Sequence, residues 1–129
     1  MRIRCIASTP TAEQAQRLGS AYDSERSDYD LDLLREYVAL GIGCWDGIAW
    51  AQIATDGGWV LSVPLFLFEV SEATASRYWE VRLRPTGVTM WPSALYEPTF
   101  NSELADDVPE AVEKFRELRR VIEAEALAH

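Results

Sequence analysis

The stretch YVALGIGCWDGIAWAQIATDGGWVLSV, residues 37–63, decides the fold. Residues 37–42 have the apolar composition of a buried strand, and Asp46–Gly47 is a strong signal for a tight hairpin turn. Residues 48–55 then form the return strand, and residues 56–58 turn the chain into another strand. Pro64 ends that strand because proline cannot donate a backbone hydrogen bond to a sheet. The stretch therefore predicts a small antiparallel sheet.

Further strands flank this stretch on both sides. Residues 2–7 alternate, with Ile3, Cys5 and Ala7 on one face. Residues 77–84 alternate as well, and a turn at 85–87 leads into a strand over 88–91. Within 77–84 the inward positions are Trp79, Val81 and Leu83, and the outward positions are Tyr78, Glu80, Arg82 and Arg84.

Helices are predicted near both ends of the chain. The first begins with Thr9 as N-cap and Pro10 in its first turn, and it stops at Gly19. The second begins at Asp107, where Asp107-x-x-Glu110 resembles a capping box. Its apolar stripe consists of Val108, Ala111, Val112, Phe115, Leu118 and Ile122, and its solvated side offers the pairs Glu110–Lys114 and Arg119–Glu123.

These elements together predict the α+β class. We expect one domain over residues 1–129, built as a small twisted antiparallel sheet or an SH3-like partial barrel. The sheet has about five to six strands, and the C-terminal helix packs on it.

Charge restricts the class of partner. The chain has 12 basic and 21 acidic residues, a net charge of −9. Nucleic acids and anionic membranes are bound through Lys and Arg, so neither is an expected partner. A protein with a basic surface would be attracted, although the charge also serves solubility alone. No export signal or membrane span is visible, which favours the cytoplasm.

The residues that usually carry catalysis are sparse. The single histidine, His129, is the last residue, so Ser–His and Cys–His sites are not expected. Cys5 and Cys44 are far apart and fit neither a disulfide framework nor a zinc site, so we expect two reduced, small apolar residues and no metal or cofactor. We therefore predict that the protein is not an enzyme. The alternative is a small enzyme or ligand-binding protein with Glu80 in a Trp-lined cleft.

Residues 20–32 are polar and acidic and show no apolar period. Asp28-x-Asp30-x-Asp32 resembles the start of a calcium loop, but Leu33 and Ala39 occupy the positions of the required Gly and Glu. A solvated loop is one interpretation, and a partner-binding surface is the other. The predicted partner-binding residues are Tyr22, Asp23, Glu25, Asp28, Tyr29, Asp30, Asp32 and Trp45. Whether Trp45 and Trp59 belong to the core or to an interface stays open at this point.

Three segments carry a resemblance to a known group of proteins. They are residues 35–42 (REYVALGI), the run from Trp59 to Val70 with PLFLFEV at 64–70, and Tyr78–Trp79. In the order and spacing of these strand and turn segments, the chain resembles small uncharacterised bacterial proteins with a helical tail. Some of those proteins are similar to immunity proteins of toxin systems. The resemblance implies a protein that binds and blocks a toxin, and it offers no catalytic residues.

The predicted function is thus a protein-binding module, most concretely a cytoplasmic immunity-type inhibitor that occludes a basic partner. An acidic mimic of nucleic acid, such as a phage-encoded inhibitor, is a further alternative. We expect a monomer or a weak dimer.

Overall fold

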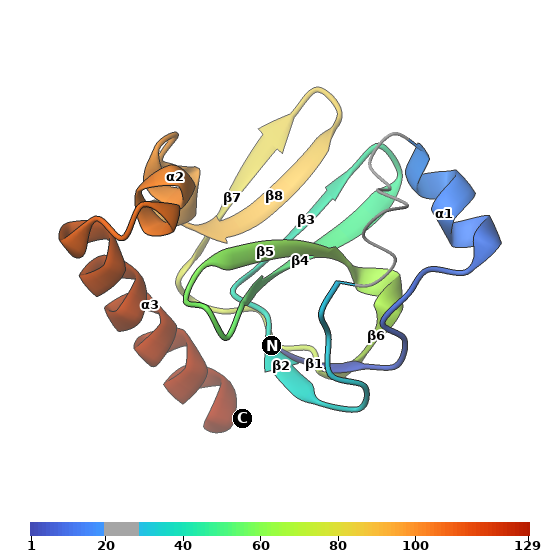
Figure 1. Cartoon of the computed structure of the whole chain (residues 1–129), viewed down its shortest axis with the longest axis horizontal. Helices are drawn as coiled ribbons and strands as arrows, with labels where there is room; N and C mark the ends of the chain where they lie inside the picture. Colours follow the sequence, from blue (N-terminus) through green and yellow to red (C-terminus); the bar gives the residue numbers. More distant parts are fainter. Residues whose placement is uncertain (20–28) are drawn as a thin grey trace.

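The computed structural model describes residues 1–19 and 29–129. Within these residues the chain is an α+β structure with eight strands in two antiparallel sheets and a long C-terminal helix (Figure 1). The strands are β1 (Arg2–Cys5), β2 (Glu36–Val38), β3 (Gly41–Trp45), β4 (Ile48–Ala54), β5 (Val60–Pro64), β6 (Phe68–Glu72), β7 (Trp79–Arg84) and β8 (Gly87–Pro92). The helices are α1 (Ala12–Leu18), α2 (Phe100–Ala105) and α3 (Pro109–Leu127), with 3₁₀ turns η2 (Leu65–Leu67) and η3 (Ser93–Tyr96).

The small sheet has the order β2-β1-β6, and the large sheet has the order β5-β4-β3-β8-β7. Side chains of both sheets meet in the main core, where Ile3 and Phe68 of the small sheet join Ile42 and Ile53 of the large one. The predicted α+β class and C-terminal helix are confirmed. There are more strands than predicted because residues 68–72 also form a strand and because residues 37–42 do not form a single one.

The stretch from Tyr37 to Ile42, predicted as one strand, belongs to two strands in different sheets. Between them the N–H of Ala39 donates to the carbonyl of Met1 at 3.0 Å, and that of Leu40 to the carbonyl of Gln52 at 2.7 Å. The chain therefore leaves the small sheet and enters the large one at these two residues. Both are almost fully buried, which explains why the sequence shows an unbroken apolar run.

Helix α1 begins two residues later than predicted. Thr11, not Thr9, is its N-cap, and it forms a reciprocal capping box with Gln14. The predicted stop at Gly19 is confirmed, since this residue follows the helix with φ of +57°, a conformation that favours glycine. Leu18 fixes the helix to the large sheet by packing with Ile48 and Trp50.

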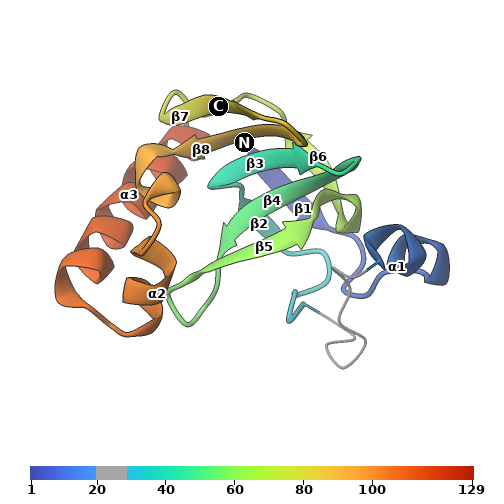
Figure 2. The ribbon, with the colours of Figure 1, turned by 90° about the horizontal axis from the view of Figure 1, so that it is seen from above.

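Helix α3 begins at Pro109 with Val108 as N-cap, so the predicted capping box at Asp107 is wrong. Asp107 instead has φ of +53° and belongs to the tight connection from α2. The predicted apolar stripe of α3 shares a core with Leu40, Phe100 and Leu104. Ala111, Phe115 and Ile122 of the stripe are buried, and Val108, Val112 and Leu118 are half-buried. Figure 2 shows α3 and α1 at opposite ends of the molecule.

The two predicted ion pairs of α3 have different outcomes. Arg119 and Glu123 form the expected pair at 2.6 Å. Lys114 pairs with Glu97, which precedes α2, and not with Glu110. The tertiary contact brings a carboxylate from another segment to the lysine, so spacing along the helix does not decide the pairing.

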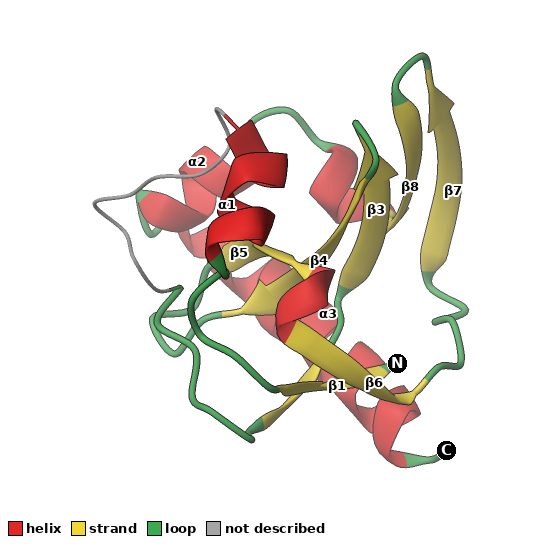
Figure 3. Cartoon of the chain, turned by 90° about the vertical axis from the view of Figure 1, so that its right-hand side faces the viewer, coloured by secondary structure: helices red, strands yellow, loops and turns green. Residues whose placement is uncertain are grey.

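The alternation predicted for residues 77–84 is present in β7, but its inward face is not covered at Val81 and Leu83. These side chains are 65% and 84% exposed, whereas Trp79 is half-buried and donates its indole N–H to the carbonyl of Leu40. The cause is the length of the β7–β8 hairpin, which extends beyond the small sheet (Figure 3). None of the described helices is both long and apolar enough to cross a bilayer.

Candidate functional site

The acidic segment is described only from residue 29 onward. Tyr22, Asp23, Glu25 and Asp28, four of the predicted partner-binding residues, lie outside the described residues. Tyr29 is half-buried and packs against the main core. Of the predicted carboxylates that the structure describes, Asp30 and Asp32 both lie exposed on the surface.

Backbone hydrogen bonds attach the loop over residues 31–35 to β1. The N–H of Leu34 donates to the carbonyl of Cys5 at 2.8 Å, and the N–H of Cys5 donates to the carbonyl of Arg35 at 3.0 Å. Leu31 is buried and anchors the loop from inside. The loop is therefore bonded to β1 through its backbone, although it has no regular secondary structure.

Two leucines of this loop point to solvent. Leu33 is 62% exposed and Leu34 is 65% exposed. Leu34 also has φ of +67°, a left-handed conformation that costs a residue with a side chain about 1–2 kcal/mol. Exposed apolar side chains on a strained, well-fixed backbone add nothing to the core, and such features gather at functional sites.

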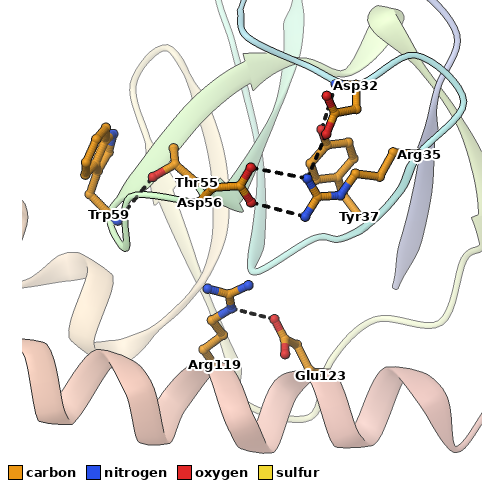
Figure 4. Close-up of polar contacts among 8 residues, drawn as sticks. All are labelled: Asp32, Arg35, Tyr37, Thr55, Asp56, Trp59, Arg119 and Glu123. Carbon is orange, nitrogen blue, oxygen red and sulfur yellow. Dashed lines mark hydrogen bonds and ion pairs between the residues drawn. The ribbon is translucent and has the colours of Figure 1, made fainter.

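Arg35 connects this loop to the turn between β4 and β5. Its guanidinium contacts Asp32 at 2.9 Å and Asp56 at 3.3 Å, and it lies 4.8 Å from the ring centre of Tyr37 (Figure 4). Both carboxylates accept hydrogen bonds from Arg35 and raise its pKa above the usual value. The hydroxyl of the buried Tyr37 accepts a hydrogen bond from the N–H of Asp32 at 2.9 Å. This bond ties the backbone of Asp32 to the core side of the cluster.

The turn that carries Asp56 also presents a tryptophan. The N–H of Thr55 donates to the carbonyl of Trp59 at 2.9 Å, and the N–H of Trp59 donates to the hydroxyl of Thr55 at 3.3 Å. The indole ring lies over Gly57, where an added Cβ would be 2.1 Å from it. Trp59 is still 49% exposed, so the turn holds a large ring at the surface.

The ion pairs of this surface contribute little to the stability of the fold. Asp32, Arg35 and Asp56 are all substantially exposed, and exposed ion pairs contribute about 0–1 kcal/mol to stability. The cluster carries more negative than positive charge, because one guanidinium meets two carboxylates. We give the name acidic face to the exposed residues of the two segments that Arg35 joins, namely Asp30, Asp32, Leu33, Leu34, Arg35, Asp56 and Trp59.

Comparisons with protein-family models, with curated proteins and with solved structures find no match to this chain.

Trp45, the remaining predicted contact residue, belongs to a different surface. Its ring stacks on Trp50 at 5.6 Å and meets the edge of Trp91 at 6.4 Å, and it lies over Gly43. It is half-buried, as a flap on the large sheet. Trp45 pairs with the first residue of β4 and Asp56 follows its last, so roughly 20 Å or more separates them. The structure does not bring Trp45 to the acidic face.

Glu80, on which the enzyme alternative rests, is half-exposed and pairs with Arg82 at 3.0 Å. The pair joins two positions of one strand that are separated by a single residue. A hollow of about 660 Å³ lies elsewhere, between the β6–β7 connection and the C-terminal half of α3. Its lining includes Arg77, which pairs with Glu125, and Arg120, which pairs with Glu117. Glu80 is not among its lining residues.

The described residues contain no group of three or more side chains suited to hold a metal ion. Cys5 is buried, as predicted for a small apolar residue, and burial raises the pKa of its thiol. Cys44 is exposed, because the end of β3 lies on the same uncovered face as Val88 of the β7–β8 hairpin.

Sequence reasoning missed the residues that complete the acidic face, namely Leu33, Leu34, Arg35, Asp56 and Trp59. The sequence pattern indicates only a turn at Asp56, and Arg35 lies 21 positions before it. The one available signal was the pair of leucines at 33–34, two adjacent apolar residues that directly follow the acidic run and precede Arg35.

Proposed function

We propose that this chain is a protein-binding module, an immunity-type inhibitor that occludes a basic partner protein in the cytoplasm, and that the acidic face is part of its contact surface. One observation carries the proposal. Asp32 and Asp56, from separate segments, converge on Arg35, and the same two segments carry exposed apolar side chains.

Charge supports the class of partner. With a net charge of −9 the protein attracts basic surfaces at a distance, and carboxylates at the rim of an interface mainly accelerate association. The carboxylates of the acidic face supply this attraction where apolar side chains are also exposed. Arg35 pairs with both Asp32 and Asp56, so a basic partner meets two carboxylates that lie close together.

Apolar anchors support a tight complex. Interfaces are stabilised by a few large side chains near their centre, with tryptophan strongly enriched. Trp59 and the leucines at 33 and 34 offer such side chains on backbone that is already fixed. A preformed surface loses little conformational entropy on binding, which favours affinity. Inhibition by this route is steric, because the bound chain covers the partner's working surface.

In the experiment, this chain is immobilised and used to isolate its partner. The partner is then identified, to test whether it is the product of the adjoining gene. Affinity is then measured for Trp59→Ala and for the matched control Leu83→Ala, which removes an exposed apolar side chain elsewhere. We expect Trp59→Ala to weaken binding about tenfold or more and Leu83→Ala to leave it unchanged. Equal affinity of Trp59→Ala and the wild type would remove the acidic face from the interface.

A further inference from the structure

Strand β7 is the outermost strand of the large sheet, and β8 is its partner among the described strands. Arg84 and Gly87 flank the short turn Pro85–Thr86, so they form a hydrogen-bonded pair, and such pairs alternate along the ladder. Arg82 and Glu80 therefore also direct their backbone groups to β8. Pro92, which has no N–H, stands opposite Trp79, as this alternation requires.

The backbone groups of the intervening residues point to the open edge. Val81 and Leu83 direct both their N–H and their C=O groups away from β8. At Trp79 only the carbonyl is available at this edge, because its N–H donates to the carbonyl of Ser76. An open edge of this kind is a template for another strand. The side chains of Val81 and Leu83 are mostly exposed on one face, next to Val88 and Cys44.

We propose that β7 pairs antiparallel with β7 of a second copy of this chain, with Val81 opposite Val81 of the second copy on a twofold axis. In this register the central valines exchange backbone hydrogen bonds, and Leu83 donates to the carbonyl of Trp79 in the other copy. The four side chains of Val81 and Leu83 from the two copies then lie along one continuous face. The two-fold symmetry makes every contact occur twice.

Charge selects this register among those that keep the apolar face continuous. With Val81 central, Glu80 stands opposite Arg82 of the second copy, and Tyr78 stands opposite Arg84. A shift by one residue to either side places Arg82 opposite Arg82, or Glu80 opposite Glu80, and directly opposed like charges destabilise a sheet. Glu80 and Arg82 are both half-exposed, so each has room to contact its counterpart in the second copy.

The proposed dimer leaves the acidic face free. Asp56 and Trp59 lie in the turn next to β5, at the opposite edge of the large sheet from β7. A dimer joined through β7 therefore presents two acidic faces, and its formation does not depend on the proposed function. A single strand pair is a small interface, so we expect dissociation on dilution.

The test uses the full chain alone, in sedimentation equilibrium at rising concentration. Val81→Pro removes an N–H that β8 does not use, so the fold is retained while the central pair of hydrogen bonds is lost. Val81→Ala is the matched control, because it shortens the side chain and keeps the N–H. We expect the wild type and Val81→Ala to pass from monomer to dimer and Val81→Pro to remain monomeric, with unchanged circular dichroism.

Charge reversal tests the register. Arg82→Glu places like charges opposite each other twice, and we expect the dissociation constant to rise about tenfold or more. Adding Glu80→Arg restores opposite charges and should return the dissociation constant to the wild-type range. A wild type that stays monomeric at every concentration, or a Val81→Pro protein that dimerises like the wild type, would overturn the proposal. Dimerisation that is unaffected by Arg82→Glu would overturn the register.

Discussion

Helix α3 and strand β7 each carry a regular row of apolar side chains, yet the described residues cover only the row on α3. Phe115 in α3 is 4% exposed, and Ile122 is fully buried. Leu83 in β7 is 84% exposed, although it follows an equally regular alternation. The helix lies across the end of the large sheet, whereas the hairpin of β7 and β8 extends past the small sheet that covers its neighbours.

The difference shows what an apolar period reports. It identifies a face that gains free energy when it is covered, but it does not identify the covering element. On α3 that element is part of the same chain. On β7 the described residues provide none, and the open hydrogen-bonding edge beside the apolar face fits another strand.

Thiol chemistry offers the largest contrast between covered and uncovered faces. Cys5 lies in the main core, and Cys44 lies on the uncovered face of the β7–β8 hairpin. We expect a thiol reagent to modify Cys44 at least about a thousandfold faster, because Cys5 reacts only after unfolding. Reaction of Cys5 at a rate near that of Cys44 in the native protein would show that the core is open at β1.

The buried thiol of Cys5 makes the free energy of unfolding depend on pH. Burial raises the pKa of Cys5 in the folded chain. Between the ordinary thiol pKa and this raised value, the unfolded chain is ionised at Cys5 while the folded chain keeps its proton. The free energy of unfolding should therefore fall as pH rises through that window, and Cys5→Ala should remove this dependence when both are measured by denaturant titration.

Truncation of one side chain from each row gives the next largest effect. Phe115→Ala should lower the free energy of unfolding by about 3–5 kcal/mol, because it leaves a cavity beside Phe100. Leu83→Ala should change it by less than about 0.5 kcal/mol, because the side chain is already in water. Denaturant unfolding at low protein concentration, where any dimer has dissociated, measures both. Equal losses would mean that the two rows are covered alike.

A smaller change in the free energy of unfolding is expected at Leu34, an exposed apolar residue that lies in a loop and not on a helix or strand. Its φ of +67° is tolerated better by asparagine than by leucine. Leu34→Asn should therefore raise the free energy of unfolding by up to about 1 kcal/mol while it weakens binding to the partner. A gain in stability with unchanged affinity would show that Leu34 has no role in the acidic face.

Much of the fold follows from local signals in the sequence. The turn at Asp46–Gly47, the stop at Gly19 and the stripe around Phe115 depend on neighbouring residues, and each is confirmed. The change of sheet at Ala39 and Leu40 was not predictable, because burial on both sides of a crossing gives the same apolar run as one strand.

The candidate site could be predicted only in part. The exposure of Asp30 and Asp32 follows from a polar segment without a period. The convergence of Asp32 and Asp56 on Arg35 depends on the packing of the 31–35 loop against β1, which no local pattern encodes. The left-handed backbone of Leu34, whose N–H donates to the carbonyl of Cys5, likewise has no signal in the residue type.

The rate of association with the isolated partner, at low and high salt, tests the acidic face most directly. The variant Asp32→Asn/Asp56→Asn is compared with Asp106→Asn/Asp107→Asn, which removes the same charge from the exposed connection between α2 and α3. We expect the first variant to associate several-fold more slowly than the wild type at low salt and equally fast at high salt, because salt screens exposed charges, and the second variant to follow the wild type. Equal rates for Asp32→Asn/Asp56→Asn and the wild type at both salt concentrations, or equal slowing by both variants, would contradict a partner that docks on the acidic face.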